Sequence, residues 1–120
     1  MIYHVVALGD WLADPDLPYA PASLVRDGSV HCSPDKGAAL AAATRFHRAA
    51  ADPLVALLID ETRLDAEVKW VAPAAGSPLA RVPGTLFPRV VGPVNRNAVV
   101  GLMEIVRDDE GSAQELVPLG

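Results

Sequence analysis

The chain places a histidine, its only cysteine and two serines together in the segment Ser29–Pro34, SVHCSP. Such residues can build a thiol nucleophile, a metal site or the polar wall of a ligand site. A cysteine nucleophile requires a base within hydrogen-bond reach of the thiol. His31 and Cys32 are neighbours on an expected strand, so their side chains point to opposite faces and His31 cannot activate Cys32. The sequence therefore favours Cys32 as a small apolar core residue.

A metal site is disfavoured by the spacing of the possible ligands. The histidines His4, His31 and His47 and the single cysteine lie far apart in the chain. They form neither a C-x-x-C nor an H-E-x-x-H pattern, which are the usual spacings of zinc ligands. We therefore predict no metal-binding residues.

A polar ligand site has more support from the pattern. His31 shares an expected strand face with Ser29 and Ser33, and His4 lies in the first expected strand. If these two strands pair, both imidazoles project from one face of one sheet. An imidazole can donate to a ribose or phosphate oxygen, or take up a proton. The alternative is that both histidines are core residues bonded to backbone carbonyls.

Arg89 is a candidate for binding an anion. It is the only charged residue of the segment Gly84–Pro93, GTLFPRVVGP, and its guanidinium offers a rigid fork for phosphate or carboxylate. Considered alone, Arg89 would be interpreted as an exposed arginine on an edge strand. Beside the two histidines it becomes a candidate anion clamp, and Tyr3 is a further candidate ligand contact. Glu104 is expected to face outward from the last strand.

Apolar runs and turn residues predict the elements that position these side chains. Strands are expected at 2–8, 29–32, 54–60, 68–72, 85–87, 89–91 and 98–106. One long helix is expected at 36–49, with Ser33 as its N-cap and Pro34 in the first position. The order lacks the regular strand–helix alternation of a doubly wound sheet. We therefore predict an α+β fold with a split, mostly antiparallel β core and one main helix.

The domain boundaries follow from length and from the placement of prolines. A chain of 120 residues supports one domain, expected at 1–106, with 107–120 as a loosely attached tail. The 11 prolines fall mostly between apolar runs, where they end elements. The small-residue segment 73–83 is the best candidate for a mobile lid.

Composition limits the class of protein. The chain is 51% hydrophobic and carries a formal net charge of −5, without the basic stripe typical of nucleic-acid binding. One cysteine cannot form an internal disulfide, which fits a reducing compartment. The sequence shows neither a signal peptide nor an apolar run that could span a membrane. We expect a cytoplasmic protein with a small-molecule ligand, and the oligomeric state stays open.

Several motifs together resemble a known family. The sequences IYHV, VHCSP, LVALLID, G-x-LFP-x-x-x-GP and AVVGLMEI occur in the order typical of the domain of unknown function 952. That family is similar to the ADP-ribosyltransferase superfamily, in which a split β core holds NAD. The resemblance implies that His4 contacts a ribose and that His31 lies beside the nicotinamide. It is closest to the branch with two histidines, which includes the RNA 2′-phosphotransferases.

The chain departs from the family pattern at two positions. Family members have a His and a Tyr where this chain has Arg89 and Val91. The resemblance implies an enzyme acting on NAD or a related nucleotide, with His4 and His31 as catalytic residues. Arg89, from the chemistry of its guanidinium rather than from the resemblance, would hold a phosphate. The alternatives are a secondary-metabolite cyclase or isomerase that uses the two histidines as acid and base, or a non-catalytic ligand-binding module.

Overall fold

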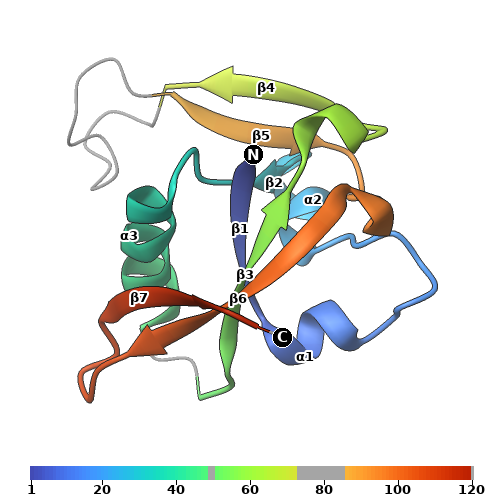
Figure 1. Ribbon diagram of the computed structural model, residues 1–120. Helices are drawn as coiled ribbons and strands as arrows, with labels where there is room; N and C mark the ends of the chain where they lie inside the picture. The colour runs from blue at the N-terminus through green and yellow to red at the C-terminus, as the bar shows by residue number, and fades with distance from the viewer. Residues whose placement is uncertain (49–50, 73–85, 120) are drawn as a thin grey trace.

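Two antiparallel sheets form the framework of the protein (Figure 1). The computed structural model describes residues 1–48, 51–72 and 86–119. Within these ranges the larger sheet has the order β1-β3-β6-β7 and the smaller sheet the order β2-β5-β4. The larger sheet consists of β1 (Ile2–Ala7), β3 (Leu54–Ile59), β6 (Val99–Arg107) and β7 (Ala113–Pro118). The smaller sheet consists of β2 (Val30–His31), β5 (Phe87–Val91) and β4 (Glu67–Val71).

The helices of the described part are short, apart from one. They are α1 (Leu8–Leu12), α2 (Ala22–Asp27) and α3 (Lys36–His47), with 3-10 turns η1 (Glu61–Arg63) and η2 (Arg96–Ala98). The α+β class and the mostly antiparallel pairing are confirmed. No helix in the described ranges is long and apolar enough to cross a membrane.

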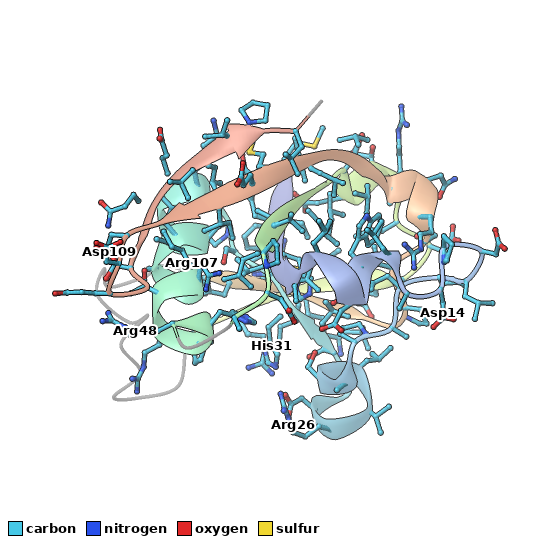
Figure 2. All side chains as sticks on the ribbon, turned by 90° about the horizontal axis from the view of Figure 1, so that it is seen from below. Asp14, Arg26, His31, Arg48, Arg107 and Asp109 are labelled. Atoms are coloured by element: carbon cyan, nitrogen blue, oxygen red, sulfur yellow. The ribbon has the colours of Figure 1, made fainter. Side chains whose placement is uncertain are left out.

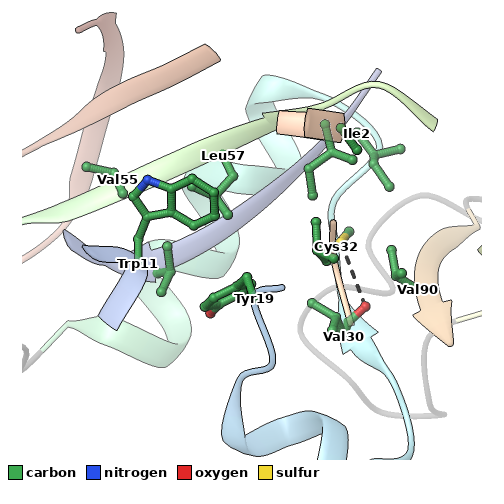
Figure 3. Close-up of a cluster of buried hydrophobic side chains, with 12 residues drawn as sticks. Ile2, Trp11, Tyr19, Val30, Cys32, Val55, Leu57 and Val90 are labelled. Carbon is green, nitrogen blue, oxygen red and sulfur yellow. Dashed lines mark hydrogen bonds between the residues drawn. The ribbon is translucent and has the colours of Figure 1, made fainter. Parts of the chain in front are cut away.

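Two apolar clusters pack against the opposite faces of the larger sheet. One face of β1 and β3 packs against the smaller sheet and against Trp11 and Tyr19 (Figure 3). The other face packs against α3 through Ala39 and Ala43, whose small side chains let the helix lie close to the sheet. The smaller sheet lies across the end of the larger one where the chain begins (Figure 1). Its outer face points away from this core.

The start of α3 differs from the prediction. The N-cap is Asp35, whose Oδ1 accepts a hydrogen bond of 2.8 Å from the backbone N–H of Ala38. Ser33 is not the cap because its backbone is paired with Tyr3, by hydrogen bonds of 2.9 and 2.7 Å. This bridge links the chain after β2 to the edge of the larger sheet.

A single strand, β5, runs through Pro88, where the sequence predicted two separate strands. Pro88 is tolerated in this central strand because its carbonyl accepts from the Cys32 N–H at 3.0 Å and therefore faces β2. In an antiparallel ladder the N–H and C=O of one residue point to the same side. The missing donor would thus also face β2, which ends at His31, and no hydrogen bond to β4 is lost.

The C-terminal segment is not a loosely attached tail, so this expectation is wrong. Ala113–Pro118 form β7, which pairs along β6 with partners from Met103 to Arg107. Its residues extend the larger sheet and pack partly against α3. The predicted lid at 73–83 lies outside the described residues.

Gly111 offers a test of the turn that joins β6 to β7. Its φ is +84°, and an added Cβ would overlap the carbonyl oxygen of Arg48. Gly111→Ala is therefore expected to lower the free energy of unfolding by at least about 1 kcal/mol. Gly37→Ala is the control, since its added Cβ would meet only Asp35 Oδ1, at 3.5 Å. In the helix it is expected to stabilise by about 0.5–1 kcal/mol, and urea denaturation with equal shifts for both variants would contradict this account.

Candidate functional site

His4 is a buried residue whose two ring nitrogens both have partners. Its side chain is enclosed, with 8% of the residue exposed. Nδ1 lies 2.7 Å from the carbonyl oxygen of His31, and Nε2 lies 3.1 Å from the Tyr19 hydroxyl. A carbonyl can only accept, so Nδ1 carries the proton and Nε2 accepts from Tyr19.

Burial keeps both members of this pair neutral. It lowers the pKa of His4 to about 4, because desolvation outweighs the hydrogen bond to His31. Burial also raises the pKa of Tyr19 well above its ordinary value. His4 is therefore an uncharged imidazole at neutral pH, and its hydrogen bond holds the main chain of β2 in place.

His31 lies in a different environment. Its side chain is 44% exposed, and Nε2 lies 2.9 Å from Oδ2 of Asp27. The same carboxylate accepts hydrogen bonds from Arg26 at 3.2 to 3.3 Å. The hydrogen bond from Arg26, and then the one from His31, lower the pKa of Asp27. Figure 2 shows Arg26 and His31 side by side on one edge of the molecule.

The expectation that both imidazoles face one open surface is wrong. β1 and β2 belong to different sheets and are linked by the bridge between Tyr3 and Ser33. His4 shares its strand face with Ile2 and Val6, which pack into the core between the sheets. His31 alternates with the buried Val30, so its ring points away from that core.

A short chain reversal brings Asp27 and His31 together. Helix α2 ends at Gly28, whose φ of 75° is left-handed and whose N–H donates to the Leu24 carbonyl. This is a common helix ending, and glycine adopts it without steric cost. Asp27 is the last residue of α2, and His31 is the last residue of β2. The turn at Gly28 reverses the chain between them, and this brings the two side chains within hydrogen-bond distance.

Arg89 and Lys69 extend the exposed face beside His31. The register pairs His31 with Arg89 across β2 and β5, and Arg89 with Lys69 across β5 and β4. Directly opposite residues share a face, so these three side chains form one row across the smaller sheet, here called the cationic row after its two permanent cations, Arg89 and Lys69. The Cys32 N–H bond to Pro88 makes His31 and Arg89 a non-hydrogen-bonded pair, with Cα atoms about 4.5 Å apart.

The two permanent cations of the row have no carboxylate partner among the described residues. The ion pairs of that part of the chain involve neither Arg89 nor Lys69. Glu67 lies on the same face, two residues before Lys69 on β4, and it too forms no ion pair there. Like charges directly opposite each other destabilise a sheet. The cationic row is therefore suited to an external anion.

The remaining predicted contact residues do not share this surface. Ser29 and Ser33 are each only 5% exposed, so the expected serine–histidine face is not formed. The Ser29 hydroxyl has no hydrogen-bond partner among the described residues. Tyr3 is half-buried and packs against the cluster under α3. Strand β2 covers only two residues, so alternation does not extend to Ser29 or Ser33.

Two further predictions, for Cys32 and Glu104, are confirmed. Cys32 is a core residue, and burial raises the pKa of its thiol to about 12. Glu104 faces outward from β6. Asp60 caps η1, with its carboxylate accepting from the Thr62 N–H at 3.0 Å.

Sequence reasoning missed three residues of the site. Asp27 carried part of a local signal, because Gly28 directly after it favours a helix ending, but the approach of its carboxylate to His31 depends on the turn that follows. Lys69 lies on the opposite strand face from Val68 and Trp70, but nothing in the sequence indicates that it is a neighbour of Arg89. Tyr19, in a proline-rich loop, contacts His4 through the fold alone, so no sequence pattern could have identified it.

Two hollows elsewhere on the surface are less suited to an anion. One, of about 400 Å³, is lined by Asp10, Asp14, Tyr19 and Arg96, among others. Its guanidinium is already engaged, since Arg96 donates to three carbonyls and stacks 4.2 Å from the Trp11 ring centroid. The other, of about 610 Å³, is lined by four carboxylates and two guanidiniums near the β6–β7 turn. Figure 2 shows Asp14 and Asp109, one from each hollow, on opposite sides of the molecule.

These features define a small α+β domain whose larger sheet is packed on both faces and whose smaller sheet presents a cationic row to solvent. The chain belongs to the DUF952 family, described as a protein of unknown function, whose model matches residues 6–102. The fold is similar to the crystal structure of protein CC0527 from Caulobacter crescentus, at 24% identity and a TM-score of 0.75. The similarity covers 94% of this chain and 92% of that one.

A double methionine mutant of CC0527 is similar to this chain to the same extent, at 23% identity and a TM-score of 0.75. It likewise aligns with 94% of this chain and 92% of its own. At these identities the likeness shows the fold alone. Among curated proteins, none matches this chain.

Proposed function

We propose that the protein binds a small phosphate-bearing molecule, NAD or a related nucleotide, on the outer face of the smaller sheet and acts on it there. The observation that carries the proposal is the cationic row, in which Arg89 and Lys69 stand opposite each other without a carboxylate partner among the described residues. A phosphate between them would offset their repulsion and accept hydrogen bonds from both.

The charge of the whole chain strengthens this reading. The formal net charge is −5, so the protein as a whole repels anions. The adjacent cations Arg89 and Lys69 are therefore a local feature of an acidic protein rather than part of a general basic surface. Arg89 supplies the planar fork that matches two phosphate oxygens, and Lys69 supplies a mobile point charge.

The surroundings of Arg89 suit the rest of a nucleotide. Phe87 and Val91 lie on the same face of β5 as Arg89, since the alternate residues Pro88 and Val90 are buried. An aromatic and an aliphatic side chain beside a guanidinium offer a surface on which a flat base can stack. The resemblance to the ADP-ribosyltransferase superfamily makes NAD the first ligand to test, with His31 as the acid–base group.

A non-catalytic binding module is the second candidate function. The environment of His4 favours it, because both ring nitrogens are bonded within the protein and the residue is enclosed. A reaction that uses one histidine as acid and the other as base at the same surface is then unsupported. His31 is the one histidine of the pair that remains available for acid–base chemistry. Binding of NAD without release of nicotinamide would favour the binding module over the enzyme.

Arg89→Gln tests the proposed site directly. Removing the guanidinium should weaken NAD or ADP binding roughly 10- to 100-fold, as expected for lost charge-assisted hydrogen bonds. The control is Arg45→Gln, which removes the same charge from the exposed face of α3. Isothermal titration calorimetry measures both variants, and chromatography follows nicotinamide release. An absence of binding by the wild-type protein at millimolar ligand, or equal effects of both variants, would overturn the proposal.

A further inference from the structure

We infer that Asp27 fixes the tautomer of His31, so that Nδ1 presents a lone pair on the sheet face shared with Arg89, and that the ligand carries a hydroxyl beside its phosphate. The inference rests on the proposed function, since it specifies which phosphate-bearing molecules the cationic row accepts. Asp27 is a positioning residue, because it acts through His31.

The hydrogen bond between Asp27 and His31 decides which ring nitrogen carries the proton. Arg26 donates to both oxygens of the Asp27 carboxylate, at 3.2 to 3.3 Å. These bonds lower the pKa of Asp27, so the carboxylate is ionised at neutral pH and can only accept. His31 Nε2, 2.9 Å away, must therefore donate. In the neutral imidazole Nδ1 is then the unprotonated nitrogen, and it has no partner among the described residues.

The main chain and the ring of His31 are held independently. The buried ring of His4 donates from Nδ1 to the His31 carbonyl at 2.7 Å, which fixes the end of β2. The Cys32 N–H, one residue on, donates to the Pro88 carbonyl and holds the same segment against β5. Asp27, at the end of α2, fixes the orientation of the imidazole ring through its hydrogen bond to Nε2. A side chain fixed at both points is pre-organised for binding and loses little freedom when a ligand arrives.

The positions of His31, Arg89 and Lys69 indicate which chemical groups a ligand of this site would carry. His31 and Arg89 form a non-hydrogen-bonded pair, in which side chains approach most closely. A neutral Nδ1 accepts a hydrogen bond, and the ionised oxygens of a phosphate have no proton to donate to it. The group that meets Nδ1 must therefore be a donor, and we assign it to a hydroxyl of the ligand, while the phosphate meets Arg89 and Lys69. Ribose phosphates carry both groups within a few bonds of each other.

The first readout is the tautomer of His31 in the protein without ligand. Two-bond ¹H–¹⁵N correlation spectra of the imidazoles at pH 8 should show the proton on Nε2 in the wild type. Asp27→Asn keeps the size and hydrogen-bonding capacity of the side chain, but an amide can donate as well as accept. It should therefore increase the population with the proton on Nδ1. Asp109→Asn, in the distant β6–β7 turn, is the matched control and should change nothing.

The second readout is selectivity for the hydroxyl, measured by calorimetry with ADP, 2′-deoxy-ADP, 3′-deoxy-ADP and inorganic pyrophosphate. At least one deoxy analogue should bind roughly tenfold more weakly than ADP to the wild type. In Asp27→Asn this preference should fall below about threefold, while pyrophosphate binding changes little, because Arg89 and Lys69 are intact. Asp27→Glu should restore part of the preference.

The two proposals fail in different ways. If neither ADP nor pyrophosphate binds the wild type at millimolar concentration, the proposed function is wrong, and the assignment of a hydroxyl-bearing ligand is wrong as well. If ADP binds but the deoxy analogues bind equally well, or Asp27→Asn keeps the full preference, the inference fails and the anion site stands. A wild-type spectrum with the proton on His31 Nδ1 overturns the role of Asp27 in either case.

Discussion

Between pH 7 and pH 4 the wild-type protein is expected to lose about 3 kcal/mol more of its free energy of unfolding than a His4→Gln variant. Burial lowers the pKa of His4 from 6.5 to about 4 in the folded protein. Above pH 6.5 the imidazole is neutral in both states. Below it, the unfolded chain binds a proton that the folded protein does not. Stability is therefore lost as the pH falls from about 6.5 to about 4.

The variant removes this difference in proton binding, so its stability should change less over the same range. At pH 7 it is expected to be less stable than the wild type, because the hydrogen bonds to Tyr19 and the His31 carbonyl are altered, and this difference should shrink as the pH falls towards 4. The exposed Leu12→Ala removes no titrating group, so it is the control and should keep the wild-type pH dependence. Urea denaturation at several pH values measures all three proteins.

An NMR titration of the wild type tests the same claim without any substitution. The His4 ring should titrate with a midpoint near 4. His47 also has a pKa lowered by burial and by Arg107, so it contributes to the acid loss of both proteins alike. A His4 midpoint near its ordinary value, or identical pH profiles for the wild type and His4→Gln, would contradict the buried, doubly bonded imidazole.

Leu57→Ala is expected to have the other large effect, a loss of about 2–5 kcal/mol in the free energy of unfolding. Leu57 lies on β3, opposite His4 on one side and Leu102 on the other, and is 0% exposed. Truncation removes apolar contacts at the centre of the cluster between the sheets and leaves a cavity there. The strands on both sides prevent it from closing.

Leu12→Ala is the matched control for this substitution. Leu12 belongs to α1 and is 56% exposed, so the same change should cost less than about 1 kcal/mol. Urea denaturation measures both variants, and an unchanged m-value would show that only stability has altered. Equal losses for Leu57→Ala and Leu12→Ala would contradict the placement of the core.

Most elements could be predicted because their signals are local. Composition and spacing predicted three elements directly. These are the apolar strand β3, the strand β1 with its apolar and β-branched residues, and the alanine-rich helix α3. Strand β7 was missed because its sequence AQELVP shows no regular alternation of apolar and polar residues, and the edge of β6 supplies its pairing. Pro88 was expected to separate two strands. It is accepted inside β5 because the neighbouring strand β2 ends at His31, which the sequence does not indicate.

The candidate site was predicted only in part because it depends on pairing between distant segments. The sequence marked His31 and Arg89 as polar residues of interest but held no information on their register, which brings them face to face. It also suggested that His4 and His31 share a sheet. The partition of β1 and β2 into two sheets is a property of the whole fold, and it separates the two rings.

Chemical-shift mapping of backbone and side-chain ¹⁵N signals during titration with ADP tests the anion site most directly. We predict that the largest shifts occur at His31, Arg89 and Lys69, and that they disappear in Arg89→Gln but persist in Arg45→Gln. Shifts centred instead on the hollow beside Tyr19 and Arg96, or none at millimolar ADP, would contradict phosphate binding on the outer face of the smaller sheet.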